Sequence, residues 1–127
     1  MKAGKLTLSK AKIVSANINV VLVSDAKIKI LNKNFRKVNR ITDIISFKLS
    51  SSPLEGDIYI AEQRSKKQAV QFNHDWKKEL SYLVIHGILH LLDYKDYTPK
   101  DRLKMFAKQD KIFADLHTGN GTLETHI

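Results

Sequence analysis

Two histidines four residues apart are the feature of this sequence that points most directly to chemistry. His86 and His90 stand near the end of an apolar stretch that predicts a helix. Residues four apart lie on one face of a helix, so both imidazoles can point a nitrogen at a common ion. Cysteine is absent, which excludes thiolate ligands. Imidazole suits zinc, which would sit about 2.0–2.1 Å from each ring nitrogen.

A third ligand is available just beyond the pair. Catalytic zinc normally has three protein ligands and an open position for water. Asp93 and Asp96 follow the expected end of the helix, where the chain can turn back beneath the ion, and either could supply an oxygen. The two histidines alone would equally suit a core in which both rings are hydrogen-bonded. The nearby carboxylates favour the metal site.

The residue after the first histidine separates two kinds of zinc enzyme. Zinc peptidases of the HExxH type place a glutamate there as the general base. In this sequence that position is Gly87. The usual peptidase base is therefore missing.

The elements that must position these residues can be read from hydrophobic periodicity. The helix that carries the pair is predicted at 75–92, with an apolar stripe at helical spacing and Asp75 as its N-cap. β-branched or alternating apolar runs predict strands at 17–23, 43–49 and 56–61. The last two are close enough in sequence to form a hairpin.

Three further helices and an N-terminal segment complete the expected domain. A helix at 26–35 would be capped by Asp25, and a polar helix is expected at 62–70. Thr98 and Pro99 predict the N-cap and first residue of a last helix ending near residue 116. Residues 5–14 fit an edge strand or a short helix, and their alternating leucines favour the strand.

Together these elements predict an α+β fold, a small mixed sheet of about four strands packed against helices with the metal-binding helix at its centre, as in zincin-like proteins. The 127 residues suit a single domain spanning 1–127, with a loose tail at about 118–127. No apolar run reaches the ~20 residues of a membrane span, and no secretory signal is evident. We therefore expect a cytoplasmic protein with no membrane partner. The net charge of +9 favours a polyanion such as nucleic acid.

Residues 86–96, HGILHLLDYKD, resemble the H-G-x-L-H-L-x-G-Y-D-H stretch of the YbeY family of bacterial endoribonucleases. The resemblance covers about residues 17–116, in the family's order and spacing. The other matching blocks are Asn32 with Phe35-Arg36, Thr42-Asp-Ile-Ile-Ser-Phe47, Gly56-Asp57-Ile58 and the Met105-Phe-Ala region.

The resemblance implies a metal-dependent endoribonuclease specific for single-stranded RNA. It implies a role in maturing the 3′ end of 16S rRNA and in ribosome quality control, with rRNA, the ribosome or small-subunit proteins as partners. The implied cofactor is one zinc ion, or another divalent metal, held by His86, His90 and Asp96. Asp96 replaces the family's third histidine, and a carboxylate is a competent zinc ligand at about 2.0–2.2 Å. It should also raise the pKa of bound water, because it lowers the net charge of the ion.

The resemblance also assigns a catalytic role to Arg36. A guanidinium can bind a phosphate bidentately and stabilise its developing charge. Arg36 lies in a basic cluster with Lys33, Lys37 and Arg40, which we expect to guide the RNA backbone. Two alternatives remain at this stage. One is a zinc peptidase, and the other is a metal-poor, non-catalytic protein that binds RNA or the ribosome.

The other acidic residues and histidines near the motif are not expected to bind the metal. Asp93 stands where the family has a glycine, and aspartate tolerates left-handed backbone better than most residues. Glu79, two turns before His86, is interpreted as a partner of a ligand or as a surface residue. Three histidines are expected at the surface: His74, His117 and His126.

Overall fold

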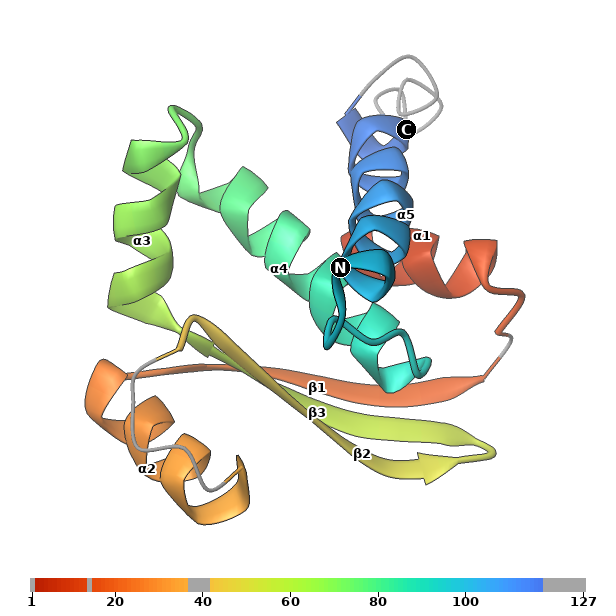
Figure 1. Cartoon of the computed structure of the whole chain (residues 1–127), viewed down its shortest axis with the longest axis horizontal. Coiled ribbons are helices and arrows are strands. Elements are labelled where there is room, and N and C mark those ends of the chain that lie inside the picture. Colours follow the sequence, from red (N-terminus) through yellow and green to blue (C-terminus); the bar gives the residue numbers. More distant parts are fainter. Residues whose placement is uncertain (1, 14, 37–41, 118–127) are drawn as a thin grey trace.

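A small sheet with helices on both of its faces organises the fold (Figure 1). The computed structural model of the chain describes residues 2–13, 15–36 and 42–117. Within these residues the elements are, in chain order, α1 (Lys2–Lys10), β1 (Ala16–Val23), α2 (Asp25–Arg36), β2 (Ile44–Ser51), β3 (Leu54–Ala61), α3 (Glu62–Gln71), α4 (Trp76–Leu91) and α5 (Pro99–His117). The predicted α+β class is confirmed.

Alternating side chains of the central strand separate two hydrophobic clusters. Ile58 and Ile60 of β3 face the main core, in which α4 lies against the sheet and α1 and α5 pack against α4 (Figure 1). Tyr59 and Ala61 face the opposite side, which α2 covers. Successive residues of a strand point to opposite faces, so β3 serves both layers at once.

The sheet is mixed, as predicted, and its order is β1-β3-β2. β2 and β3 form the expected antiparallel hairpin, and β1 runs parallel to β3. The described residues contribute three strands to this sheet, whereas about four were expected. The difference is the N-terminal segment.

Residues 5–14 were predicted as an edge strand, and this prediction is wrong. The chain forms α1 instead, because its small residues repeat at helical spacing. Ala3 and Thr7 are each only 1% exposed, and Thr7 Oγ1 donates to the Ala3 carbonyl at 2.7 Å. Lys10 forms a 2.7 Å ion pair with Asp115, which joins α1 to α5. Small side chains at i and i+4 let two helices approach closely, and that spacing overrides the alternation of the leucines.

Helix starts follow the capping residues closely. Asp75 Oδ1 accepts the Lys78 amide at 2.8 Å, and Thr98 Oγ1 accepts the Asp101 amide at 3.1 Å, so both predicted caps are confirmed. The cap of α2 is one residue earlier than predicted. Ser24 Oγ accepts the Lys27 amide at 3.1 Å, and Asp25 is the first residue of the helix. None of the helices in the described segments is both long and apolar enough to cross a membrane.

Helix α4 approaches the sheet closely at Gly87. A Cβ atom there would lie 2.9 Å from Ile58 Cδ1 and 3.1 Å from Ser46 Oγ. Ser46 Oγ also donates to the Gly87 carbonyl at 3.2 Å. A larger side chain at this position would force Ile58 or the helix itself to move. The height of α4 above the sheet is therefore set by a glycine.

Replacing two helical glycines by alanine should give opposite effects on stability. Gly87→Ala should lower the free energy of unfolding by about 1–3 kcal/mol, the usual cost of overpacking a core. Gly4→Ala should leave it unchanged or raise it by about 0.5–1 kcal/mol. At Gly4 a Cβ would meet Ile88 Cδ1 at an ordinary 3.4 Å. Urea denaturation followed by circular dichroism measures both, and equal stabilities of the two variants would contradict this packing account.

Candidate metal centre

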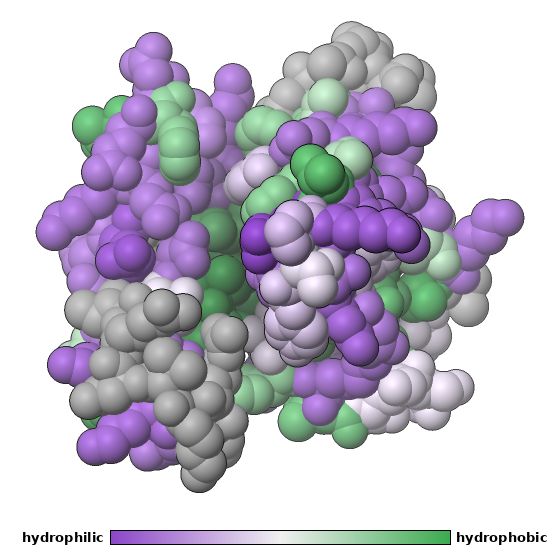
Figure 2. Space-filling model, viewed as in Figure 1, coloured by the Kyte–Doolittle hydropathy of each residue, from purple (hydrophilic) through white to green (hydrophobic). Residues whose placement is uncertain are grey.

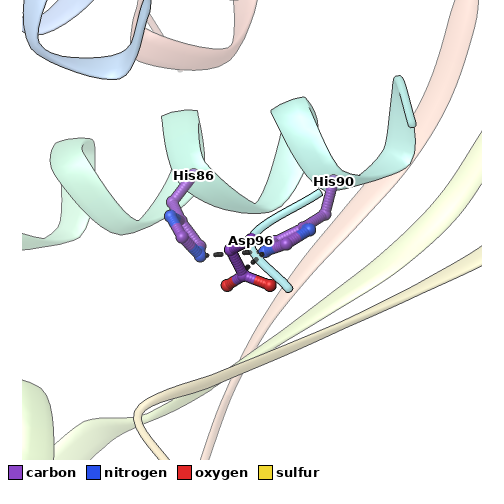
Figure 3. A group of neighbouring side chains, drawn as sticks. All are labelled: His86, His90 and Asp96. Atoms are coloured by element: carbon purple, nitrogen blue, oxygen red, sulfur yellow. Dashed lines mark hydrogen bonds and ion pairs between the residues drawn. The ribbon is translucent and has the colours of Figure 1, made fainter. Parts of the chain in front are cut away.

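Helix α4 brings His86 and His90 together on one face, as their spacing predicted (Figure 3). Their Nε2 atoms lie 3.0 Å apart and their ring centroids 4.6 Å apart. Both side chains are partly exposed rather than sealed within the core, and both line the same cleft. The alternative of two rings buried in the core is therefore not what the fold provides.

The chain turns sharply after α4, at Asp93. Asp93 has φ of 72°, the left-handed conformation that the sequence suggested it could tolerate. Its side chain is 76% exposed, and its carboxylate accepts from Lys48 Nζ at 2.7 Å. Of the two aspartates considered as the third ligand, this one is engaged elsewhere.

Asp96 is the aspartate that the turn returns to the histidines (Figure 3). Its Oδ2 lies 3.5 Å from His90 Nε2, and its carbonyl accepts from Arg102 Nη1 at 3.3 Å. One ligand atom from each of His86, His90 and Asp96 lies within 4.8 Å of the other two. Ligands of a tetrahedral zinc ion lie about 3.4 Å from one another, so this set needs little adjustment to close on an ion.

Hydrogen bonds at the far side of each ring decide which nitrogen faces the cleft. His86 Nδ1 lies 3.1 Å from Gln109 Oε1, and His90 Nδ1 lies 3.1 Å from the Tyr94 carbonyl. Both partners are acceptors, so each neutral ring carries its proton on Nδ1. Two Nε2 lone pairs then face each other across 3.0 Å. That arrangement is unfavourable alone and favourable around a cation, so the donor set fits a divalent metal.

Two adjoining cavities lie beside the histidines. The larger, about 430 Å³, is lined by the start of β2, by α4 and by the 93–97 turn, and it contains His86, His90 and Asp96. The smaller, about 340 Å³, lies between α3 and α5, where Figure 2 shows apolar side chains recessed between two polar surfaces. Asp43, Ile44 and His86 line both cavities. A chain-like ligand could therefore pass the metal centre and occupy both.

Two groups near the smaller cavity have partners of their own. Glu79 is buried, so it is not a surface residue, and its Oε1 accepts from His74 Nε2 at 2.8 Å, a histidine outside the proposed ligand set. His74 is correspondingly half-buried rather than exposed. Burial, followed by the nearby Asp110, raises the pKa of Tyr82 to about 12. Tyr82 therefore stays protonated at neutral pH and donates to Asp110 at 3.1 Å.

The predicted RNA-binding cluster is only partly placed. Lys33 is exposed on α2, and Arg36 is the last residue of that helix, although its side chain lies outside the described part of the structure. Lys37 and Arg40 also lie outside the described residues, as do His126 and the side chain of His117. Thr42 and Asp43, which follow this segment, line the larger cavity.

Comparison with known proteins identifies the family. A family model described as Endoribonuclease YbeY matches residues 2–117. The chain belongs to the YbeY family. The relative from Endomicrobium trichonymphae, named Endoribonuclease YbeY, is 47% identical over 111 residues, which cover 87% of this chain and 79% of that protein. The Thermotoga maritima and Bacillus subtilis proteins of the same name are 41% and 36% identical, over 84% and 76% of this chain and 72% and 70% of theirs.

A solved structure agrees with the YbeY fold seen here. The solution structure of TM1509 from Thermotoga maritima superposes with a TM-score of 0.65 at 34% sequence identity. The match covers 98% of this chain and 83% of that one. Both the family and the fold predicted from the sequence are therefore confirmed.

Exchanging one carboxylate for an amide at two neighbouring positions should identify the third metal ligand. Asp96→Asn should weaken zinc binding about tenfold or more, because the set loses its only anionic ligand. Asp93→Asn should stay within about threefold of the wild type, since asparagine also tolerates the left-handed turn. Competition with a chromophoric chelator measures both affinities. A larger loss in Asp93→Asn would assign the ligand to Asp93 instead.

Proposed function

We propose that this chain is a metal-dependent endoribonuclease that hydrolyses phosphodiester bonds of single-stranded RNA. Its family membership supports RNA as the substrate, because its relatives carry the name Endoribonuclease YbeY. The single observation that carries metal dependence is the convergence of His86, His90 and Asp96 in an open cleft. Two imidazoles and a carboxylate suit zinc better than the harder magnesium or calcium ions.

The geometry of the site suggests a separate role for each of its residues. A zinc ion here would supply a Lewis acid for a water molecule or a phosphoryl oxygen. His86 and His90 would hold it through Nε2, and Asp96 would complete the set. Ser46, by contrast, has a structural task, because its hydroxyl is engaged by the Gly87 carbonyl. Arg36 is proposed to bind the phosphate and offset the charge that develops on it.

The shape of the site favours a single strand. The two cavities meet at His86, so nucleotides on either side of the cleaved phosphate would enter different cavities. The rigid backbone of an A-form duplex cannot follow such a recessed path as easily as a flexible strand can. The net charge of +9 would draw the RNA backbone toward the protein, and Lys33, Arg36, Lys37 and Arg40 are proposed to guide it. We assign the protein to rRNA maturation at the 16S 3′ end and ribosome quality control in the cytoplasm, with the ribosome or small-subunit proteins as partners.

The zinc peptidase alternative is disfavoured by packing as well as by sequence. A general base beside the first histidine would have to occupy the position of Gly87, where even a Cβ atom meets Ile58 at 2.9 Å. A metal-poor protein that only binds RNA remains the alternative to be tested. It differs from the proposal in having no bound metal and no cleavage activity.

Cleavage of RNA should require the metal and its ligands. The untagged protein should cleave a single-stranded RNA of the 16S 3′ region and leave the same RNA intact when it is annealed to a complementary strand. Chelator should abolish cleavage and added zinc should restore it. His86→Ala should cleave no faster than the chelated wild type. Gel electrophoresis of end-labelled RNA measures the rates, and circular dichroism checks folding.

Parallel incubation with casein separates the alternatives. Digestion of casein without digestion of RNA would indicate the peptidase. Stoichiometric RNA binding with neither metal nor cleavage would indicate the non-catalytic protein. Either outcome would overturn the proposal.

A separate comparison on α2 tests the role of Arg36. Arg36→Ala should lower kcat about 10²–10³-fold, because a donor to the transition-state charge is lost. Lys29→Ala, which removes an exposed cation from the same helix, should leave kcat unchanged. Cleavage rates over a range of RNA concentrations give kcat and KM separately. A raised KM with an unchanged kcat in Arg36→Ala would reduce this residue to RNA attraction alone.

A further inference from the structure

We propose that Gln109 of α5 is a positioning residue for the metal centre, fixing the tautomer and the orientation of His86; this inference rests on the metal centre of the proposed function. Gln109 is a glutamine side chain in the interior, only 1% exposed. Its Oε1 lies 3.1 Å from His86 Nδ1. The residue is 23 positions from His86 in sequence and comes from another helix.

The orientation of the Gln109 amide is determined by its second hydrogen bond. Its Nε2 donates to the Tyr82 backbone carbonyl at 3.3 Å. If the amide were reversed, its oxygen would face that carbonyl oxygen and two acceptors would meet. The Tyr82 carbonyl therefore directs the amide oxygen toward His86. An oxygen at that place can only accept, so the proton of the neutral ring is held on Nδ1.

Burial makes this arrangement hard to replace. Water has little access to a side chain that is 1% exposed, so it cannot substitute for either hydrogen bond of Gln109. One turn earlier on α5, Phe106 stacks on the His86 ring, with centroids 6.3 Å apart and planes inclined by 26°. The Gln109 amide thus fixes which edge of the His86 imidazole faces α5, and the Phe106 ring limits the tilt of that imidazole. Both constraints come from α5.

The second histidine shows why the first needs such a residue. His90 Nδ1 donates to the Tyr94 carbonyl at 3.1 Å, an acceptor that the turn at the end of α4 supplies from its own backbone. His86 lies mid-helix, where the surrounding carbonyls are engaged in helical hydrogen bonds. A side chain from α5 takes the place of the missing carbonyl. Without it the proton could move to Nε2 and occupy the lone pair that a metal ion requires.

The experiment compares Gln109→Leu, Gln109→Met and Gln109→Glu in the full-length protein. Leucine and methionine remove the acceptor while keeping an apolar volume. Glutamate keeps an acceptor oxygen facing Nδ1 and, in its protonated form, donates to the Tyr82 carbonyl as the amide does. Tyr82→Phe is the matched control. It removes the 3.1 Å hydrogen bond to Asp110 between the same two helices and leaves the Tyr82 backbone carbonyl in place.

Two measurements report on positioning without any RNA. Nitrogen-15 NMR of the metal-free protein at about pH 8, above the ordinary pKa of histidine, shows which ring nitrogen of His86 carries the proton. Chelator competition gives the zinc affinity. Wild type and Gln109→Glu should carry the proton on Nδ1 and bind zinc within about threefold of each other. The leucine and methionine variants should gain an Nε2-protonated population and bind zinc about 10- to 100-fold more weakly, as when other partners of metal-bound histidines are removed.

Other outcomes would overturn the inference. A wild-type His86 protonated on Nε2 would do so at once. An unchanged zinc affinity in Gln109→Leu or Gln109→Met would also overturn it, provided that circular dichroism shows the variant to be folded. An equal loss of zinc affinity in Tyr82→Phe would overturn it too, because the effect would then be one of helix packing. Because the tautomer is read without zinc or RNA, failure here is distinguishable from an absence of RNA cleavage.

Discussion

The contact between the backbone of α4 and the sheet at Gly87 is the constraint on which the rest of the site depends. The Ser46 hydroxyl binds the Gly87 carbonyl at 3.2 Å, and Ile58 fills the space where a side chain would stand. At this short separation the face of α4 that carries His86 and His90 opens onto the cleft beside the start of β2. A larger residue at position 87 would raise the helix and change the depth of the cleft. The same glycine leaves no place for the general base of a peptidase.

Features that depend on neighbours within one helical turn could be predicted from the sequence. The convergence of His86 and His90 follows from their spacing alone. The caps at Asp75 and Thr98 and the left-handed turn at Asp93 likewise depend on local backbone chemistry. Asp96 joins the histidines because that turn is tight, so most of the proposed ligand set could be predicted before any tertiary contact was known.

Features that depend on packing between distant segments could not be predicted in this way. The leucines of the N-terminal segment alternate, whereas its burial is decided by Ala3 and Thr7, whose small size matters only because α4 lies above them. Gln109 has no local signal at all, since its role is defined by His86 and a backbone carbonyl on another helix. Glu79 was misjudged although its partner His74 is only five residues away, because its burial depends on the packing of α3 against α4.

Charge explains why a basic protein with an acidic cleft would suit a metal-dependent nuclease. Asp43, Asp93 and Asp96 all line the larger cavity, and Asp93 alone of the three is paired with a lysine, Lys48, among the described ion pairs. Lys95 lines the same cavity, so a phosphate that entered it without an ion would be surrounded by three carboxylates and one lysine. A divalent ion held by His86, His90 and the Asp96 carboxylate would have a net charge of +1 with its ligands. With a third neutral imidazole in place of Asp96, the net charge would be +2. The net positive charge of the protein would then attract RNA, and the ion would bind the phosphate beside the histidines. Because Asp96 weakens the attraction of the ion for the phosphate, the arginine proposed to bind that phosphate, Arg36, would contribute more here than beside three neutral ligands.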